Sequence, residues 1–239
     1  MELVWEIRNL ARQGFEEASN FAKEWWEAPH TVGTPFACSR ATALEMTRYI
    51  TKGDGRRILD VGTGDGVTID AMLPNLGKND KVVIVECGKG FCARLREKYK
   101  NDNRIEIYEG KIQDYAKFVL QGSGDQIEAK LFDHVVGAVP MHSLPTAKAV
   151  DEVFKAHIDL IKRTKGGTYT QVGYAGMATL KTCLTLWERK IAQEIVATKE
   201  ALYRTHNAYS VVVWKNLPPA RVHHMKFTVR DLEESKKDR

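Results

Sequence analysis

Asp60-Val61-Gly62-Thr63-Gly64-Asp65-Gly66, directly after the apolar pair Ile58-Leu59, is the stretch that decides the fold. An apolar run that ends in alternating glycines predicts a strand, a tight turn and the start of a helix, which brings backbone N–H groups close to a nucleotide-like ligand. Glu86 follows twenty residues after Gly66, where a carboxylate accepts both hydroxyls of a ribose. Glycines in such a turn can also serve helix–strand packing alone. The acid at this distance favours a cofactor that contains a nucleoside.

The acidic residue before the first glycine separates two classes of cofactor. Asp60 would repel the pyrophosphate of a dinucleotide, which needs backbone N–H groups and a helix N-terminus. S-adenosylmethionine carries an ammonium and a sulfonium and no phosphate, so it suits this carboxylate better. The turn therefore resembles motif I of the class I methyltransferases. We expect S-adenosylmethionine as the cofactor and S-adenosylhomocysteine as the product.

Many class I methyltransferases place an aspartate after the third strand, where it accepts a hydrogen bond from the adenine amino group. This chain has Lys111 there, which donates hydrogen bonds but cannot accept them. Adenine recognition is therefore expected from the backbone of Ile112 together with Gln113 or Asp114. The expected cofactor-binding residues are Asp60, Gly62, Thr63, Gly64, Gly66, Glu86, Cys87, Ile112, Gln113 and Ala138.

Apolar runs alternate with stretches of helical periodicity from about Arg56 onward, which predicts an α/β fold with a parallel sheet covered by helices on both faces. The expected strands are Arg57–Val61, Val82–Glu86, Ile105–Tyr108, Leu131–Ala138 and Thr168–Tyr174, and the expected helices are Val67–Leu76, Phe91–Lys100, Gln113–Leu120, Ala147–Lys162 and Met177–Lys190. Two further extended runs, Glu194–Tyr203 and Ala208–Lys215, are joined by a short connection and predict an antiparallel pair at the sheet edge. This ending is typical of the Rossmann-like sheet of class I methyltransferases.

Three regions are expected along the chain. Residues 1–50 form an N-terminal helical extension, with an amphipathic helix, a bend rich in proline and glycine from Pro29 to Pro35, and a second helix from about Arg40 to Ile50. Residues 51–230 form the methyltransferase domain, and residues 231–239 a charged tail.

Length and composition limit the remaining possibilities. The 239 residues, 43% of them hydrophobic, can bury the core of one domain with additions. The net charge of +5 permits an anionic partner without requiring one. The four cysteines have no metal-ligand spacing, so we expect no metal and a reducing compartment. With no signal peptide and no apolar stretch of roughly 20 residues, the expected location is cytoplasmic, with peripheral contact at the inner face of the membrane.

Three blocks elsewhere resemble the bacterial phospholipid N-methyltransferases. They are the entry segment Lys23-Glu24-Trp25-Trp26-Glu27-Ala28-Pro29-His30-Thr31-Val32-Gly33, which continues to Ala37-Cys38-Ser39-Arg40; Phe132-Asp133-His134-Val135-Val136-Gly137-Ala138-Val139-Pro140-Met141-His142-Ser143-Leu144-Pro145; and Trp214-Lys215-Asn216-Leu217-Pro218-Pro219-Ala220-Arg221-Val222. The resemblance implies stepwise methylation of the amine of phosphatidylethanolamine, and of its mono- and dimethyl products, toward phosphatidylcholine. The expected partner is thus a phospholipid amine at a membrane surface.

The same family is related to the rRNA adenine dimethylases, which present Asn/Asp-Leu/Ile-Pro-Tyr/Phe to a flipped base. Here the corresponding residues are Ala138-Val139-Pro140-Met141, so the amide acceptor and the stacking aromatic are both missing. We therefore expect no stable nucleic-acid partner. N-methylation of a soluble small amine stays open as an alternative, and RNA adenine methylation or RNA binding as a weaker one.

His142 and Tyr174 are the expected catalytic residues, as acceptors or proton relays for the amine, because both follow strands that end at the cofactor. Each can also be read as a loop or packing residue. The expected substrate-binding residues are Ser39, Arg40, Tyr174 and Arg221, with Lys226 as a further candidate for a lipid phosphate. The helix within residues 1–28 contains six Glu and only three Lys or Arg, so it suits a lid or a subunit contact as well as a membrane.

Overall fold

The computed structural model describes residues 38–122, 125–174 and 186–231, which build one seven-stranded sheet in the order β3-β2-β1-β4-β5-β7-β6. The strands are β1 (Arg57–Val61), β2 (Lys81–Glu86), β3 (Ile105–Glu109), β4 (His134–Gly137), β5 (Gly167–Tyr174), β6 (Tyr209–Val213) and β7 (Ala220–Phe227). The first five are parallel, whereas β7 runs antiparallel to both β5 and β6. The predicted α/β sheet with an antiparallel end is confirmed.

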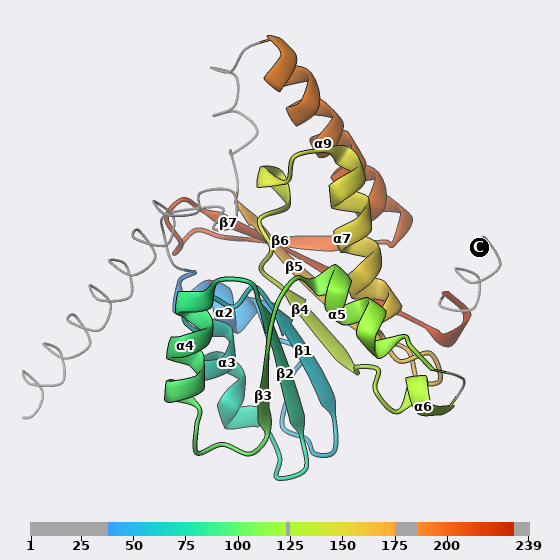
Figure 1. The fold of residues 1–239 in the computed structure, drawn as a ribbon. Helices are drawn as coiled ribbons and strands as arrows, with labels where there is room; N and C mark the ends of the chain where they lie inside the picture. Colours follow the sequence, from blue (N-terminus) through green and yellow to red (C-terminus); the bar gives the residue numbers. More distant parts are fainter. Residues whose placement is uncertain (1–37, 123–124, 175–185, 232–239) are drawn as a thin grey trace, which may run out of the picture.

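Helices cover both faces of the sheet (Figure 1). They are α2 (Arg40–Met46), α3 (Val67–Met72), α4 (Lys89–Lys98), α5 (Ile112–Val119), α6 (Asp125–Glu128), α7 (Ala147–Asp159) and α9 (Leu186–Thr205), with short 3-10 turns η1 (Leu73–Asn75) and η2 (Met141–Ser143). One core cluster joins the sheet to α2, α3 and α4, and a second joins it to α5, α7 and α9. The central strands are therefore buried on both sides, which explains their continuous apolar runs.

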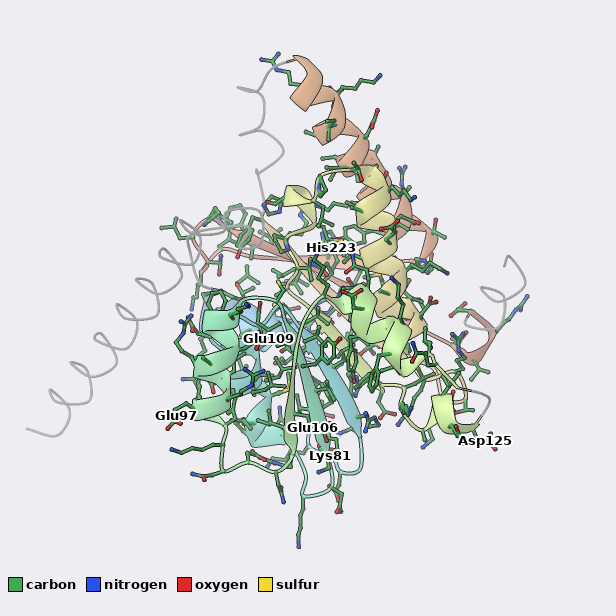
Figure 2. All side chains as sticks on the ribbon, viewed as in Figure 1. Lys81, Glu97, Glu106, Glu109, Asp125 and His223 are labelled. Carbon is green, nitrogen blue, oxygen red and sulfur yellow. The ribbon has the colours of Figure 1, made fainter. Side chains whose placement is uncertain are left out.

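Several labelled charged side chains lie at the outside of the molecule (Figure 2). Glu97 at the outer side of α4 and Asp125 in α6 lie at the periphery, whereas His223 lies between the sheet and α9, stacked 3.9 Å from the Tyr203 ring. Among the helices that the structure describes, none is long and apolar enough to cross a membrane.

Three of the sequence predictions for the second half are wrong in detail. The run Glu194–Tyr203 is not a strand but part of α9, whose buried Ile195 and partly buried Ile191 and Leu202 recur with helical spacing. The antiparallel partner of β6 is β7, which no extended run predicted. The expected strand Leu131–Ala138 shortens to His134–Gly137, since Phe132 makes only a single bridge to Ile161.

Some predicted segments lie outside the described residues. They are the amphipathic helix within residues 1–28, the bend at 29–35, the part of the helix Met177–Lys190 before residue 186, and the tail from residue 232. The second N-terminal helix is present as α2, which packs against α3.

Candidate active site

The glycine turn after β1 has a conformation that only glycine adopts without strain. Gly62, Gly64 and Gly66 have φ of 75°, 61° and 86°, all in the left-handed region. A Cβ on Gly66 would lie 2.5 Å from the Tyr99 hydroxyl, and a Cβ on Gly62 would lie 3.4 Å from the backbone of Ala138. The turn therefore packs tightly on both sides, and the helix α3 starts directly from it.

Asp60 is fully buried at the end of β1, beside this turn. Neither of its carboxylate oxygens has a hydrogen-bond partner among the described residues. Burial raises the pKa of Asp60 to about 7. The Thr68 hydroxyl, which is near but makes no hydrogen bond of ordinary geometry to this carboxylate, lowers the pKa, and the weaker effect of the Glu86 charge raises it. A buried carboxylate without a partner is costly for a protein, so this position fits a cationic group such as the ammonium of S-adenosylmethionine.

Glu86 is oriented by three backbone N–H groups at the end of β2. Its Oε1 accepts hydrogen bonds from the N–H of Cys87 at 2.8 Å and of Gly88 at 2.9 Å, and its Oε2 accepts one from Gly64 at 3.1 Å. The carboxylate therefore connects the glycine turn to the strand expected to carry the ribose acceptor. Cys87 is an exposed residue whose backbone N–H takes part in this arrangement.

The other expected cofactor residues lie at the same edge of the sheet. Ile112 is buried at the first turn of α5, and Gln113 beside it is half-buried. The N–H of Gly110 donates to the Glu86 carbonyl at 2.9 Å, and the N–H of Ala138 donates to the Val61 carbonyl at 2.8 Å. The ends of β1, β2, β3 and β4 thus meet around one position, where parallel sheets bind ligands.

His142 and Tyr174 come together as expected from their places after β4 and β5. Their rings lie edge to face with centroids 6.1 Å apart, and His142 is buried. Burial raises the pKa of Tyr174 above its usual value, so the phenol stays protonated at neutral pH. Cys38 lies in the same group. Burial, and to a smaller extent the Asp60 charge, raise the pKa of the Cys38 thiol to about 12. Cys38 in turn contributes to the raised pKa of Tyr174. In the sequence, Cys38 stands out only as part of the entry block.

Gln171 is a residue of the site region that sequence reasoning missed. Its Nε2 donates to the carbonyls of Val139 and Val172, each at 2.9 Å, and its Oε1 accepts from the Tyr169 hydroxyl at 2.6 Å. Gln171 and Tyr169 are fully buried. A Cβ on Gly137 would lie 2.4 Å from the Gln171 Oε1, so the absence of a side chain there makes room for this network. Gln171 thereby fixes the connection from β4 to η2, which carries Ala138 and His142.

The expected substrate-binding residues are placed less uniformly. The Ser39 hydroxyl caps α2 by accepting from the N–H of Thr42 at 3.2 Å, so its first role is structural. Arg40 and Arg221 are exposed, and Arg221 lies opposite Gly173 near the site edge. Lys226 is unsuited as a phosphate ligand of this site, because it pairs with Thr168 at the opposite edge of the sheet and lies over the Tyr49 ring.

No group of three His, Cys, Asp or Glu residues able to hold a metal ion occurs within the part of the chain that the structure describes.

Comparison with known proteins gives one distant relative in sequence and many in structure. No family model matches the chain. The ornithine lipid N-methyltransferase of Singulisphaera acidiphila is 24% identical over 98 residues, which cover 41% of this chain and 48% of that protein. The match therefore spans about half the length of the curated relative.

Solved structures are similar over most of the chain. The O-methyltransferase TomG of Streptomyces achromogenes has a TM-score of 0.59 at 15% identity and covers 89% of this chain and 90% of its own. The N-methyltransferase NodS of Bradyrhizobium japonicum has a TM-score of 0.54 at 13% identity, over 79% of this chain and 94% of its own. These similarities show that the chain has the class I methyltransferase fold.

Proposed function

We propose that this chain, with the fold of the class I methyltransferases, is an S-adenosylmethionine-dependent N-methyltransferase that acts on the amine of phosphatidylethanolamine and of its mono- and dimethyl products. The observation that carries the cofactor assignment is the buried carboxylate of Asp60, which has no partner among the described residues and lies beside the glycine turn. In support, the TomG structure contains S-adenosylmethionine, and a structure of a Bacillus cereus O-methyltransferase contains S-adenosylhomocysteine.

Asp60 would hold the ammonium of the cofactor, and Glu86 its ribose hydroxyls. The half-buried Gln113 and the backbone of Ile112 are available for the adenine. When bound, S-adenosylmethionine supplies an electrophilic methyl group on its sulfonium. The residues around it have to place a neutral amine in line with that methyl group and exclude water.

The amine has to lose a proton before it can react. With an amine pKa near 10, the neutral form at pH 7 costs about 4 kcal/mol. Tyr174 stays protonated and cannot take this proton, but its hydroxyl oxygen can accept a hydrogen bond from an amine N–H and orient the lone pair. His142, in edge-to-face contact with Tyr174, is the candidate for relaying the proton outward.

The lipid acceptor rests on two further observations. The sequence match is to an ornithine lipid N-methyltransferase, which by its name methylates an amino lipid. The blocks that resemble phospholipid N-methyltransferases include Cys38, His142 and Asn216, which lie around the site or connect to it. Against RNA adenine methylation, Met141 is not only non-aromatic but also buried, so nothing at that position is available to stack on a base.

Methyl transfer from labelled S-adenosylmethionine to several acceptors tests the proposal. Detergent-dispersed phosphatidylethanolamine, ornithine lipid, soluble amines and RNA are supplied in parallel, with Tyr174→Phe as the variant and Phe118→Ala, a distant exposed site, as its control. We expect the label to enter phosphatidylethanolamine. Tyr174→Phe should lower kcat, whereas the control Phe118→Ala should leave kcat unchanged. If the label entered only ornithine lipid, phosphatidylethanolamine would be refuted as the acceptor. If the label entered RNA or a soluble amine while both lipids stayed unlabelled, a lipid substrate would be refuted.

A further inference from the structure

The connection between β6 and β7, residues 214–219 and here called the hairpin tip, exposes two large apolar side chains. Trp214 is 78% exposed and Leu217 is 75% exposed, more than any other large hydrophobic residue that the structure describes. Isolated apolar residues on a surface are ordinary, but an exposed tryptophan close to an exposed leucine in one short loop is not explained by the core.

The hairpin tip is held firmly although these two side chains are exposed. Asn216 in its middle is buried, and its Oδ1 accepts hydrogen bonds from the Ser39 N–H at 2.8 Å and the Thr42 hydroxyl at 3.1 Å. Its Nδ2 donates to the Pro218 carbonyl at 2.8 Å. The loop is thus anchored to α2 through one buried residue, which leaves Trp214 and Leu217 presented to solvent on a fixed base.

The hairpin tip lies at the edge of the sheet where the candidate site lies. β7 begins at Ala220, which pairs with Tyr174 at the end of β5, and Val213 at the end of β6 pairs with Ala220. Ser39, bonded to Asn216, directly follows Cys38, whose thiol is influenced by the charge of Asp60. A surface that contacts the hairpin tip therefore also faces the approach to the site.

Three exposed cations lie within or beside the hairpin tip, and the surrounding stretch 206–223 contains no Asp or Glu. Lys215 within the hairpin tip and Arg221 just after it are exposed, and so is Arg40 at the start of α2, next to the anchored Ser39. Exposed aromatic and aliphatic side chains flanked by cations match the interface of a bilayer that contains anionic lipid.

We infer that the hairpin tip is a docking surface for an anionic phospholipid bilayer, with Trp214 and Leu217 at the level of the headgroups and Lys215 and Arg221 against lipid phosphates. This docking surface rests on the proposed function, because a protein that methylates a phospholipid has to reach a membrane. It also locates the membrane contact in a described, basic part of the chain rather than in the acidic helix predicted within residues 1–28.

Vesicle flotation of the full chain tests this docking without requiring the reaction. Vesicles of phosphatidylcholine alone are compared with vesicles that also contain phosphatidylglycerol, at low and high salt. We expect binding to the anionic vesicles that weakens with salt, and a loss of about tenfold or more for Trp214→Ala/Leu217→Ala. Lys215→Glu should weaken the binding and reduce its salt dependence. Phe118→Ala, which removes a 58% exposed side chain from α5, is the control and should bind as the wild type does.

Two results would overturn the inference. One is wild-type flotation by the double variant. The other is a wild-type chain that fails to bind vesicles but shows an oligomer in light scattering that the double variant loses, because the hairpin tip would then be a contact between copies. Methyl transfer to detergent-dispersed lipid separates this question from the proposed function: the double variant should keep that activity while losing transfer to vesicles. Vesicle binding that needs the hairpin tip, with no lipid methylated, would refute the function and leave the docking standing.

Discussion

At the scale of single residues, Asp60 determines how this protein should respond to pH. Its folded-state pKa of about 7 lies above the value of 3.8 expected for the unfolded chain. Between these values the folded state holds a proton that the unfolded state has released, so the free energy of unfolding of the ligand-free protein falls as the pH rises through this window. Asp60 is therefore a residue that the fold keeps at a cost to stability.

Asp60→Asn removes this cost and a ligand contact together. We expect the free energy of unfolding without ligand to rise by about 2 kcal/mol at pH 8, measured by urea titration. Calorimetry with S-adenosylhomocysteine should show wild-type affinity increasing as the pH rises through about 7, and weak affinity with no such slope in the variant. Asp65→Asn is the control, because Asp65 in the same turn already pairs with Arg94 at 2.7 Å. A slope that persists in Asp60→Asn would contradict the assignment.

Gly66→Ala tests the steric requirement of the turn. The new Cβ would lie 2.5 Å from the Tyr99 hydroxyl at a φ of 86°, so we expect a loss of about 2–4 kcal/mol in the free energy of unfolding. Gly173→Ala is a matched control, since no atom lies within 4 Å of its Cβ position and its φ is not positive. Equal melting temperatures for the two variants would show that the turn relaxes without cost.

The difference between Asp60 and Gln171 shows which site residues a sequence can predict. Asp60 and the three glycines belong to one strand-to-turn unit, and Glu86 ends the next strand, so local patterns in the sequence are enough to identify them. Gln171 acts through Val139 and Tyr169, and its role depends on how β4 and β5 pair, which no local pattern reveals. The same holds for Cys38, whose relation to Asp60 is purely tertiary.

At the scale of elements, β5 serves two functions on its two faces. Gln171 on one face holds the connection after β4, while Thr170 on the other contacts the His224 ring at 3.1 Å, and His224 in turn contacts Glu45 of α2 at 2.9 Å. One strand thus positions the site and attaches α2 to the sheet. Substitutions on neighbouring residues of β5 should separate these two roles.

Gln171→Leu is expected to lower kcat by about tenfold or more, because the loop that carries His142 loses its hydrogen bond to Val139. The free energy of unfolding should also fall by about 2–4 kcal/mol, since the carbonyls of Val139 and Val172 and the Tyr169 hydroxyl each lose a hydrogen bond to Gln171. Thr170→Val, the control, should lower stability by about 1 kcal/mol and leave kcat unchanged well below the melting temperature. If both variants lowered kcat alike, a general loss of stability would explain Gln171→Leu.

The first half of the fold could be predicted from the sequence better than the second, for a physical reason. Strands β1 and β2 are buried on both faces, so their apolar runs are continuous, and the glycine turn marks where the first one ends. β7 carries Arg221, His223, His224 and Lys226, and its polar residues are accommodated by partners on α2, α9 and Tyr49 that a sequence does not display. The run Glu194–Tyr203 contains β-branched residues that favour a strand, but it forms a helix because it packs against α7 as part of α9.

At the scale of the whole molecule, Asn216 connects parts of the chain 177 residues apart. It holds the capping residue of α2, and through it Cys38, against the C-terminal hairpin. Since the Asp60 charge acts on the Cys38 thiol, the start of the described chain and the β6–β7 connection meet beside the candidate site. The integrity of the site therefore depends on a contact that involves none of the expected cofactor ligands.

Asn216→Ala is expected to lower the free energy of unfolding by about 2–3 kcal/mol, because the Ser39 N–H, the Thr42 hydroxyl and the Pro218 carbonyl all lose a partner. It should also weaken S-adenosylhomocysteine binding in calorimetry. The control is Thr146→Ala, which removes the N-cap of α7 and should cost about 1 kcal/mol without affecting ligand affinity. Unchanged affinity in Asn216→Ala would mean that this connection is structural only.

The strand order has a consequence for the way the chain is made. The parallel strands are complete once residue 174 has been synthesised, yet the edge of β5 is occupied by β7, the last strand in the described part of the chain, and not by β6, which precedes it. During synthesis the edge of β5 therefore stays unpaired until β7 is complete at residue 227. An unpaired strand edge can pair with other chains. The last strand acts as the closing piece of the sheet, and a nascent chain stalled before it would be the form most in need of a chaperone.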